Sequence, residues 1–151
     1  MTASNSPFSL QADILLRIPS LMAWDLLTSP TQYQWNRALQ KFEASLGFHT
    51  GSKLQLTLQS LRGPLSLVAE VVESTPGKLL TFESSFRCLF CRHQENWSFT
   101  FIEESSSTVR LIIRYSLSGA FAARVWDEKK FTVNNILNLW LESIKQQAKR
   151  M

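Results

Sequence analysis

The sequence predicts an α+β domain in which a curved antiparallel sheet of about six to seven strands packs against one long C-terminal helix. Two patterns carry this prediction. Turn-separated segments of alternating apolar and polar residues fill most of residues 39–118, and one long helical pattern follows Gly119. The length of 151 residues fits a single domain with a full hydrophobic core. We therefore expect one domain over residues 10–151, preceded by a polar, serine-rich tail at residues 1–9.

The C-terminal segment has the spacing of an amphipathic helix. Its apolar residues recur three, four and seven positions apart, with one eight-residue gap, and they are Phe121, Val125, Val133, Leu137, Trp140, Ile144 and Ala148. At about 1.5 Å per residue, a helix from about residue 120 to 148 is roughly 40 Å long. An apolar stripe of that length needs an equally long apolar surface, and the predicted strands supply it.

The N-terminal part of the domain predicts one strand and then two short helices. Residues 10–18 alternate between apolar and polar side chains and predict a strand with one buried face. Pro19 ends this strand, and Ser20 is expected to cap a helix over residues 21–28. The motif Ser29-Pro30-Thr31-Gln32 combines an N-cap serine, a proline at the first helical position and a capping-box glutamine, so a second short helix is expected there.

The middle of the chain predicts an antiparallel meander. A weak strand at residues 39–48 is followed by alternating segments that are separated by turns at residues 62–64, 75–78 and 105–107. The alternating faces of these segments carry Leu54, Leu56, Leu58, Leu65, Leu67, Ala69, Val71, Leu80, Phe82, His93, Glu95, Trp97, Phe99, Phe101, Val109, Leu111, Ile113, Tyr115 and Leu117.

Composition and charge argue against several classes of protein. The net charge is +4, but the basic residues are scattered singly and form no stripe interleaved with aromatic residues, so no nucleic-acid partner is expected. Residues 1–11 have neither a basic n-region nor an apolar h-region, and no apolar run approaches the roughly 20 residues that span a bilayer. Two cysteines in such a chain indicate a reducing compartment, so we expect a cytoplasmic protein without an integral membrane segment.

One formal motif, the CxxC of Cys88 and Cys91, falls between two predicted strands. A redox pair usually lies at a helix N-terminus, and a zinc site needs about four ligands, whereas only His49 and His93 remain to complete one. We therefore expect two ordinary thiols, no metal and no cofactor. The apolar tip Leu89-Phe90 is unusual for a hairpin, and either packing against the helix or contact with a pocket mouth or lipid surface would account for it.

Three residues could perform acid–base chemistry. His93 and Glu95 lie two positions apart on one strand, on the face that also carries Trp97, and Tyr115 lies on the inner face of the next strand. A carboxylate directed into an apolar cavity is a candidate acid or base. The alternative, that His93 and Glu95 are hydrated or paired with an arginine near the open end, stays open. Tyr115 is expected to donate a hydrogen bond either to a ligand or to a backbone carbonyl.

Several segments together resemble the START-like (SRPBCC) superfamily, which includes polyketide cyclase/dehydratase-like proteins and relatives of the birch-pollen allergen. They are Ile14-x-Leu16-x-Ile18-Pro19, Ala23-Trp24-Asp25-Leu26-Leu27, Tyr33-x-x-Asn36 around Trp35, Val71-Val72-Glu73-x-x-Pro76-Gly77-x-Leu79-Leu80-x-Phe82, and Thr108-Val109-Arg110-Leu111 running to Gly119. The resemblance covers about residues 10–148. It implies a helix-grip fold with a ligand cavity between the sheet and the C-terminal helix, and it implies no particular reaction. Relatives often carry a histidine where this chain has Glu95.

We therefore expect the chain to bind a small hydrophobic or amphipathic molecule, such as a lipid, isoprenoid, polyketide or aromatic compound, in that cavity. The expected ligand-binding residues are Leu56, Leu58, Leu67, Phe82, Glu95, Trp97, Leu111, Ile113, Tyr115, Val133, Leu137 and Trp140. Whether the chain is an enzyme stays open. One alternative is a cyclase/dehydratase or hydrolase that uses Glu95, His93 or Tyr115. A second is a protein-interaction domain that resembles the C-terminal domain of chaperone-activating co-chaperones. This second alternative gains weight if the many aromatic side chains fill the cavity.

Overall fold

The computed structural model describes residues 6–29, 33–61, 63–88 and 91–151. Within these residues the elements follow the order β1 (Ser9–Leu16), α1 (Ser20–Leu27), β2 (Leu39–Phe48), β3 (Lys53–Ser60), β4 (Gly63–Thr75), β5 (Leu79–Cys88), β6 (Cys91–Ser105), β7 (Thr108–Gly119) and α2 (Ala122–Lys149). Neither helix of the described part combines the length and apolar character needed to cross a membrane.

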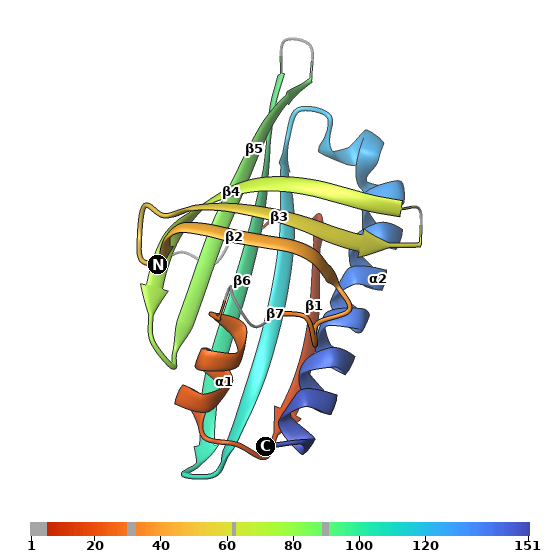
Figure 1. The fold of residues 1–151 in the computed structure, drawn as a ribbon. Helices are drawn as coiled ribbons and strands as arrows, with labels where there is room; N and C mark the ends of the chain where they lie inside the picture. Colours follow the sequence, from red (N-terminus) through yellow and green to blue (C-terminus); the bar gives the residue numbers. More distant parts are fainter. Residues whose placement is uncertain (1–5, 30–32, 62, 89–90) are drawn as a thin grey trace.

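The strands form one antiparallel sheet of seven strands in the order β1-β7-β6-β5-β4-β3-β2. Strands β2 to β7 are joined as successive hairpins, and β1 pairs with β7 from Ser9↔Ser116 to Leu16↔Val109. Figure 1 shows β2, β3 and β4 crossing the direction of β5, β6 and β7, so the sheet curls, and α2 runs along its open side. The helix packs against β1, β3 and β7. The predicted helix on a curled antiparallel sheet is confirmed.

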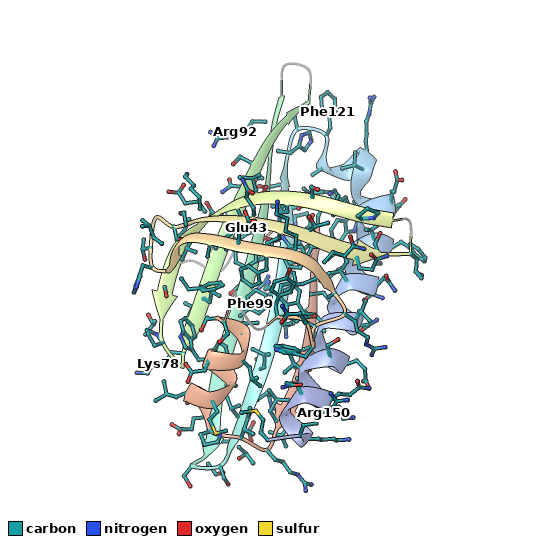
Figure 2. All side chains as sticks on the ribbon, viewed as in Figure 1. Glu43, Lys78, Arg92, Phe99, Phe121 and Arg150 are labelled. Atoms are coloured by element: carbon teal, nitrogen blue, oxygen red, sulfur yellow. The ribbon has the colours of Figure 1, made fainter. Side chains whose placement is uncertain are left out.

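Aromatic side chains fill the centre of the core. Phe99 lies in the middle of the packed side chains in Figure 2, and its ring is 5.2 Å from that of Trp140 on α2. Trp97 contacts the same helix residue, with ring centroids 6.3 Å apart. Fully burying side chains of this size contributes about 2–3 kcal/mol each from the removal of apolar surface from water. These contacts hold the second half of α2 against the sheet.

The apolar stripe of α2 is buried only in part. From Val133 to Ile144 its residues are inside, as the spacing predicts. Val125, expected on the same stripe, is 36% exposed, and Trp126 lies instead against Phe8 and Tyr115, with ring centroids 5.7 and 6.4 Å apart. The first half of the helix therefore faces a more open part of the molecule.

Two expectations for the helices near the N-terminus are wrong. Ser20 is the first residue of α1 and not its cap; Pro19 occupies the N-cap position in an extended conformation, without a side-chain capping bond, and the Ala23 N–H donates to the Pro19 carbonyl at 3.1 Å. The second short helix is absent from the described residues 33–38, while 30–32 lie outside them. The Asn36 side chain there accepts a hydrogen bond from the Ala38 N–H at 3.0 Å, which favours a turn over a helix.

The corner between β7 and α2 depends on Gly119 and His93. Gly119 has φ +135, and a Cβ atom there would lie 2.7 Å from the Arg92 carbonyl oxygen and 2.8 Å from His93 Cδ2. His93 is buried, its Nε2 accepts a hydrogen bond from the Phe121 N–H at 3.2 Å, and its ring stacks on that of Phe121 at 6.0 Å. Figure 2 shows Phe121 and Arg92 at this same end of the molecule. The start of α2 is thus fixed by a close backbone approach that requires glycine.

We expect Gly119→Ala to lower the free energy of unfolding by about 3 kcal/mol, because positive φ and a collision with backbone atoms add together. Gly47→Ala is the matched control. Gly47 also has positive φ, +63, but nothing lies within 4 Å of the added Cβ atom, so only about 1 kcal/mol should be lost. Urea denaturation of both variants measures the difference. Equal losses would show that the close packing at Gly119 does not constrain the corner.

Candidate functional site

The space between the sheet and the second half of α2 is filled by side chains. The void left there has a volume of about 10 Å³, and its lining consists of Leu27, Phe42, Phe48, Leu56, Leu80, Phe82, Phe99 and Trp140. That volume holds about one water molecule, whereas pockets for small ligands measure about 300–1,000 Å³. With the side chains in these positions, a ligand of drug size does not fit in the interior.

The expected ligand-binding residues come together, but most of them form this packed core. Leu56, Phe82 and Trp140 border the small void. Nearly all the others are buried around it, and these are Leu58, Trp97, Leu111, Ile113, Tyr115, Val133 and Leu137. Leu67 and Glu95 are different, because they also border a larger pocket that opens to the surface.

This larger pocket lies where β4 and β5 separate. Their backbone pairing ends at Glu70↔Glu83, although β3–β4 pairing continues to Gly63 and β5–β6 pairing continues to Cys88. Beyond that point the Ser84 hydroxyl donates to the Val68 carbonyl at 2.8 Å. Figure 1 shows β4 crossing over β5 and continuing toward α2. The split in the sheet therefore leaves a passage to the inner face beside the first half of the helix.

The passage holds two adjoining pockets of about 340 and 320 Å³. The first is lined by Leu65, Ser66, Leu67, Val68, Ser84, Ser85, Glu95 and Lys129. The second is lined by Ser60, Gly63, Pro64, Leu65, Val125, Glu128, Lys129 and Thr132. Leu65 and Lys129 belong to both. We call the two together the split-sheet pocket.

A buried ion pair lies in the split-sheet pocket. The Nζ of Lys129 is 2.8 Å from Oε1 of Glu95, and the side chains are 23% and 3% exposed. Removing two charges from water costs several kcal/mol per ion, which their mutual attraction offsets only at close range. Glu95 is fixed by β6, where it pairs with Ser84 on one side and Leu117 on the other. The pair therefore places a carboxylate and an ammonium group at a defined position beside apolar Leu65 and Leu67.

Tyr115 lies next to this ion pair on the inner face. It pairs with Trp97 across the β6–β7 ladder, and the two rings meet edge to face at 5.0 Å. Burial raises the pKa of Tyr115 well above its ordinary value, and the charge of Glu95 and its attraction for the hydroxyl hydrogen raise it further. The Tyr115 hydroxyl makes no hydrogen bond within the described part of the protein, so Glu95 attracts it at more than hydrogen-bond distance. Tyr115 is therefore a neutral hydrogen-bond donor.

Two further buried donors lie near Tyr115. The indole N–H groups of Trp97 and Trp140 also have no hydrogen-bond partner among the described residues. A buried donor without a partner costs about 1–3 kcal/mol, so such groups are uncommon in a core. The aromatic interior behind the ion pair is thus closely packed, but three of its polar groups have no hydrogen-bond partner among the described residues.

The three acid–base candidates have different positions. Neither Glu95 nor His93 faces bulk solvent, since they are 2% and 1% exposed. Glu95 lines the pocket and Tyr115 lies behind it, while His93 bonds the start of α2. Cys88 and Cys91 are opposite each other at the end of the β5–β6 pairing, and Leu89 and Phe90 lie outside the described residues. No three histidine, cysteine or acidic residues of the described part gather as a possible metal site.

Sequence reasoning missed Lys129, which it treated as ordinary surface charge. The signal was the eight-residue gap in the apolar stripe of α2. Lys129 lies four residues after Val125 and four before Val133, so it occupies the inward-facing position that the gap leaves empty. A cation at such a position predicts a buried acidic partner.

We expect Lys129→Met to lower the free energy of unfolding by about 3 kcal/mol, because Glu95 would remain buried without its partner. Lys53→Met is the matched control. Lys53 pairs with Glu70 at 3.2 Å on the surface, where both side chains are about half exposed or more, so its loss should cost less than about 1 kcal/mol. Chemical denaturation of both variants at low salt gives the two values. Similar losses would indicate that water screens the Glu95 carboxylate.

Tyr115 should keep its proton at a pH where an ordinary tyrosine loses it. The chain has two tyrosines, so Tyr33→Phe leaves Tyr115 as the only one. Its absorbance near 295 nm should stay constant to about pH 11 while the protein is folded and should change near pH 10 in urea. Because the native pKa is raised, the stabilisation is complete below pH about 10 and is lost as the unfolded state ionises above it. Tyrosinate formation near pH 10 in the folded variant would contradict the burial argument.

Comparison with known proteins shows that other proteins share this architecture. No protein-family model matches the sequence, and no curated protein matches it. Solved structures do match. The Zhui aromatase/cyclase from Streptomyces sp. R1128 superposes with a TM-score of 0.76 at 10% identity, over 94% of this chain and 93% of that one. A START superfamily protein from Mycobacterium smegmatis gives 0.72 at 9% identity, over 94% and 97%.

A third match is the di-domain aromatase/cyclase BexL from the BE-7585A biosynthetic pathway. Its TM-score is 0.65 at 12% identity, over 93% of this chain and 46% of that one. At these identities the comparisons establish the fold. The seven-stranded curled sheet, the long C-terminal helix and these matches together show that the chain has the helix-grip fold.

Proposed function

We propose that this protein binds a small amphipathic molecule whose polar end contacts the Glu95–Lys129 pair and whose apolar part lies against Leu65 and Leu67. One observation carries the proposal: a buried ion pair lines a surface pocket of ligand size, directly in front of an aromatic interior. Pockets for small molecules combine apolar walls with a few fixed polar groups, and this pocket has both. Solved proteins of the same fold include named aromatase/cyclases.

The unpartnered donors narrow the class of ligand. Trp97, Tyr115 and Trp140 each present a buried N–H or O–H without an acceptor in the described structure. A ligand rich in carbonyl or hydroxyl oxygens would supply acceptors, and each new bond would remove a penalty of about 1–3 kcal/mol. A saturated hydrocarbon chain would supply none. Among the candidate ligands, the geometry therefore favours oxygenated aromatic or polyketide-like compounds over fatty acyl chains or isoprenoids.

Deep binding requires movement of side chains, because the interior void is small. The ligand is expected to occupy the split-sheet pocket first and then to displace an indole ring, such as that of Trp97 or Trp140. The packed interior alone favours the protein-interaction hypothesis. The buried ion pair favours the small-molecule hypothesis, since a solid core has no need of it.

Acid–base catalysis is the second candidate function. The observation that favours it is the proximity of a buried carboxylate, which lines the pocket, to a neutral tyrosine that lies behind it. Glu95 would accept a proton from the substrate and Tyr115 would donate a hydrogen bond to an oxygen that gains charge.

A thermal-shift screen tests the binding proposal. Oxygenated aromatics such as naphthols and flavonoids should raise the melting temperature, whereas oleate at the same free concentration should not. At 100-fold excess over Kd the stabilisation is about 2.7 kcal/mol. Ile102→Ser changes an exposed residue that does not line the pocket, and it controls for surface effects. Leu67→Trp narrows the pocket and should abolish the shift while the protein remains folded. Stabilisation by oleate alone, or by no compound, would overturn the proposal.

Glu95→Gln then separates a binder from an enzyme, because it preserves shape and removes the proton acceptor. A binder should keep its affinity within a few-fold. An enzyme should keep its affinity and lose about 10²–10⁴ in turnover of whichever screened compound it converts. If the protein binds other proteins while no screened compound stabilises it, the protein-interaction hypothesis replaces both the binder and the enzyme hypotheses.

A further inference from the structure

The ion pair of the split-sheet pocket uses a lysine at a buried position where proteins favour arginine. Arginine matches a carboxylate with a planar pair of donors and is more weakly hydrated than an ammonium group. At the surface of this chain Arg110 pairs with Asp13 and Glu104. At the buried Glu95 the partner is Lys129. Lysine offers one property that arginine lacks, a primary amine that can lose a proton and form a bond to carbon.

The Lys129 side chain can be reached from the pocket. It is 23% exposed and borders both halves of the split-sheet pocket, whereas Glu95 is 3% exposed. Apolar walls lie beside it, formed by Leu65, Leu67 and Val125. Nζ of Lys129 is 2.8 Å from Oε1 of Glu95, which is a distance for direct proton transfer. A ligand in either half of the pocket therefore meets an amine that has an acid–base partner.

The charges of the ion pair select the polar end of the ligand. An anionic end would be repelled by Glu95 and a cationic end by Lys129, whereas a neutral end meets neither penalty. The carbonyl group of an aldehyde or ketone is neutral and polar, and its carbon is the atom that a lysine amine attacks. The reactive group of this lysine and the charge balance around it therefore point to the same class of ligand.

We propose that Lys129 forms a protonated imine with an aldehyde or ketone ligand in the split-sheet pocket, with Glu95 as proton carrier and counterion. This inference rests on the proposed binding function and names the reacting group of the ligand. Apolar walls that exclude water protect such an imine from hydrolysis. The carboxylate of Glu95 stabilises the positive charge of the imine as it does that of the ammonium group.

The reaction leaves the charge of the site unchanged. Glu95 accepts a proton from Nζ of Lys129, and the free amine adds to the carbonyl carbon while the C=O π electrons move to oxygen. A second nitrogen proton moves to that oxygen, which gives a carbinolamine. Glu95 then returns its proton to the hydroxyl group, water leaves, and the nitrogen lone pair forms the C=N bond. An ammonium ion and a carbonyl compound thus become an iminium ion and water.

Reductive trapping of the full chain tests the inference. Sodium cyanoborohydride reduces an iminium to a stable amine, so a lysine that reacts with 2-naphthaldehyde is located by peptide mass spectrometry. Lys129 should be labelled at least about tenfold faster than its exposed neighbour Lys130, because binding holds the aldehyde next to one amine only. 2-Naphthol has the same rings without the carbonyl group, and it should protect Lys129 and not Lys130.

Two arginine variants assign the fast reaction to one lysine. Lys129→Arg keeps a cation beside Glu95 but has no primary amine there, so the fast phase of labelling should disappear. Lys130→Arg is the matched control on the next residue of α2, and the fast phase should persist in it. Persistence of the fast phase in Lys129→Arg would overturn the inference.

Glu95→Gln tests the role of the counterion by a spectroscopic readout. The protonated imine of 4-(dimethylamino)cinnamaldehyde absorbs at longer wavelength than the neutral imine. A nearby carboxylate favours the protonated form, so the adduct of Glu95→Gln should lose its proton at a pH lower by about one to three units. An unchanged transition would overturn the assignment of Glu95 as the counterion.

Thermal stability separates failure of this inference from failure of the proposed function. If 2-naphthol raises the melting temperature but Lys129 is labelled no faster than Lys130, the inference is overturned and the binding function stands. The inference also fails if 2-naphthol stabilises the protein without protecting Lys129. If neither 2-naphthol nor 2-naphthaldehyde stabilises the protein, the proposed function fails with it.

Discussion

The packing of Trp140 against Trp97 and Phe99 is the contact on which the rest of the structure depends. It joins the second half of α2 to β6, the strand that carries both Trp97 and Phe99. Three large rings at one point exclude almost all free volume from the interior, which leaves a void for about one water. The first half of α2 cannot pack in the same way, because Lys129 stands where the apolar stripe would continue. Polar chemistry is consequently confined to that half of the helix.

The curl of the sheet determines where this chemistry meets solvent. A seven-stranded antiparallel sheet twists, so its strand axes cannot all point the same way along the helix. Here the axes of β2–β4 cross those of β5–β7 (Figure 1). The change of direction breaks the β4–β5 ladder beyond Glu70↔Glu83, and Ser84 repairs one of the lost backbone bonds with its hydroxyl. Glu95, one strand further on, thereby lines the pocket at 2% exposure while its own strand remains fully paired. The ion pair and its pocket follow from the geometry of the sheet as much as from the residues themselves.

Sequence patterns predicted most of the fold because they are local. Alternation assigned the strands and their inner faces, and the three–four spacing assigned α2, including the buried residues Val133, Leu137 and Trp140. The prediction of a second short helix was wrong because the Asn36 side chain accepts a hydrogen bond from a nearby backbone N–H and so competes with the helix. The helix-start motif at residues 29–32 carries no information about this competition. Alternation alone placed Glu95 and Tyr115 on the inner faces of successive strands. Lys129 was not identified as a site residue, because its contact with Glu95 depends on which side of the helix meets the sheet. The end of the β4–β5 pairing depends on register between strands, which no single strand encodes.

Buried polar groups in this protein divide into those that the fold needs and those that it does not. His93 belongs to the first kind, because its imidazole accepts the Phe121 N–H and packs on Gly119, and without it the start of α2 would lose its anchor. The Glu95–Lys129 pair and the Tyr115 hydroxyl belong to the second. Apolar side chains of similar shape would occupy their places at no loss, and often with a gain, in stability. A chain that retains such groups is less stable than its own core allows. The binding proposed above would supply the Tyr115 hydroxyl with the hydrogen-bond partner that the described part of the fold does not provide.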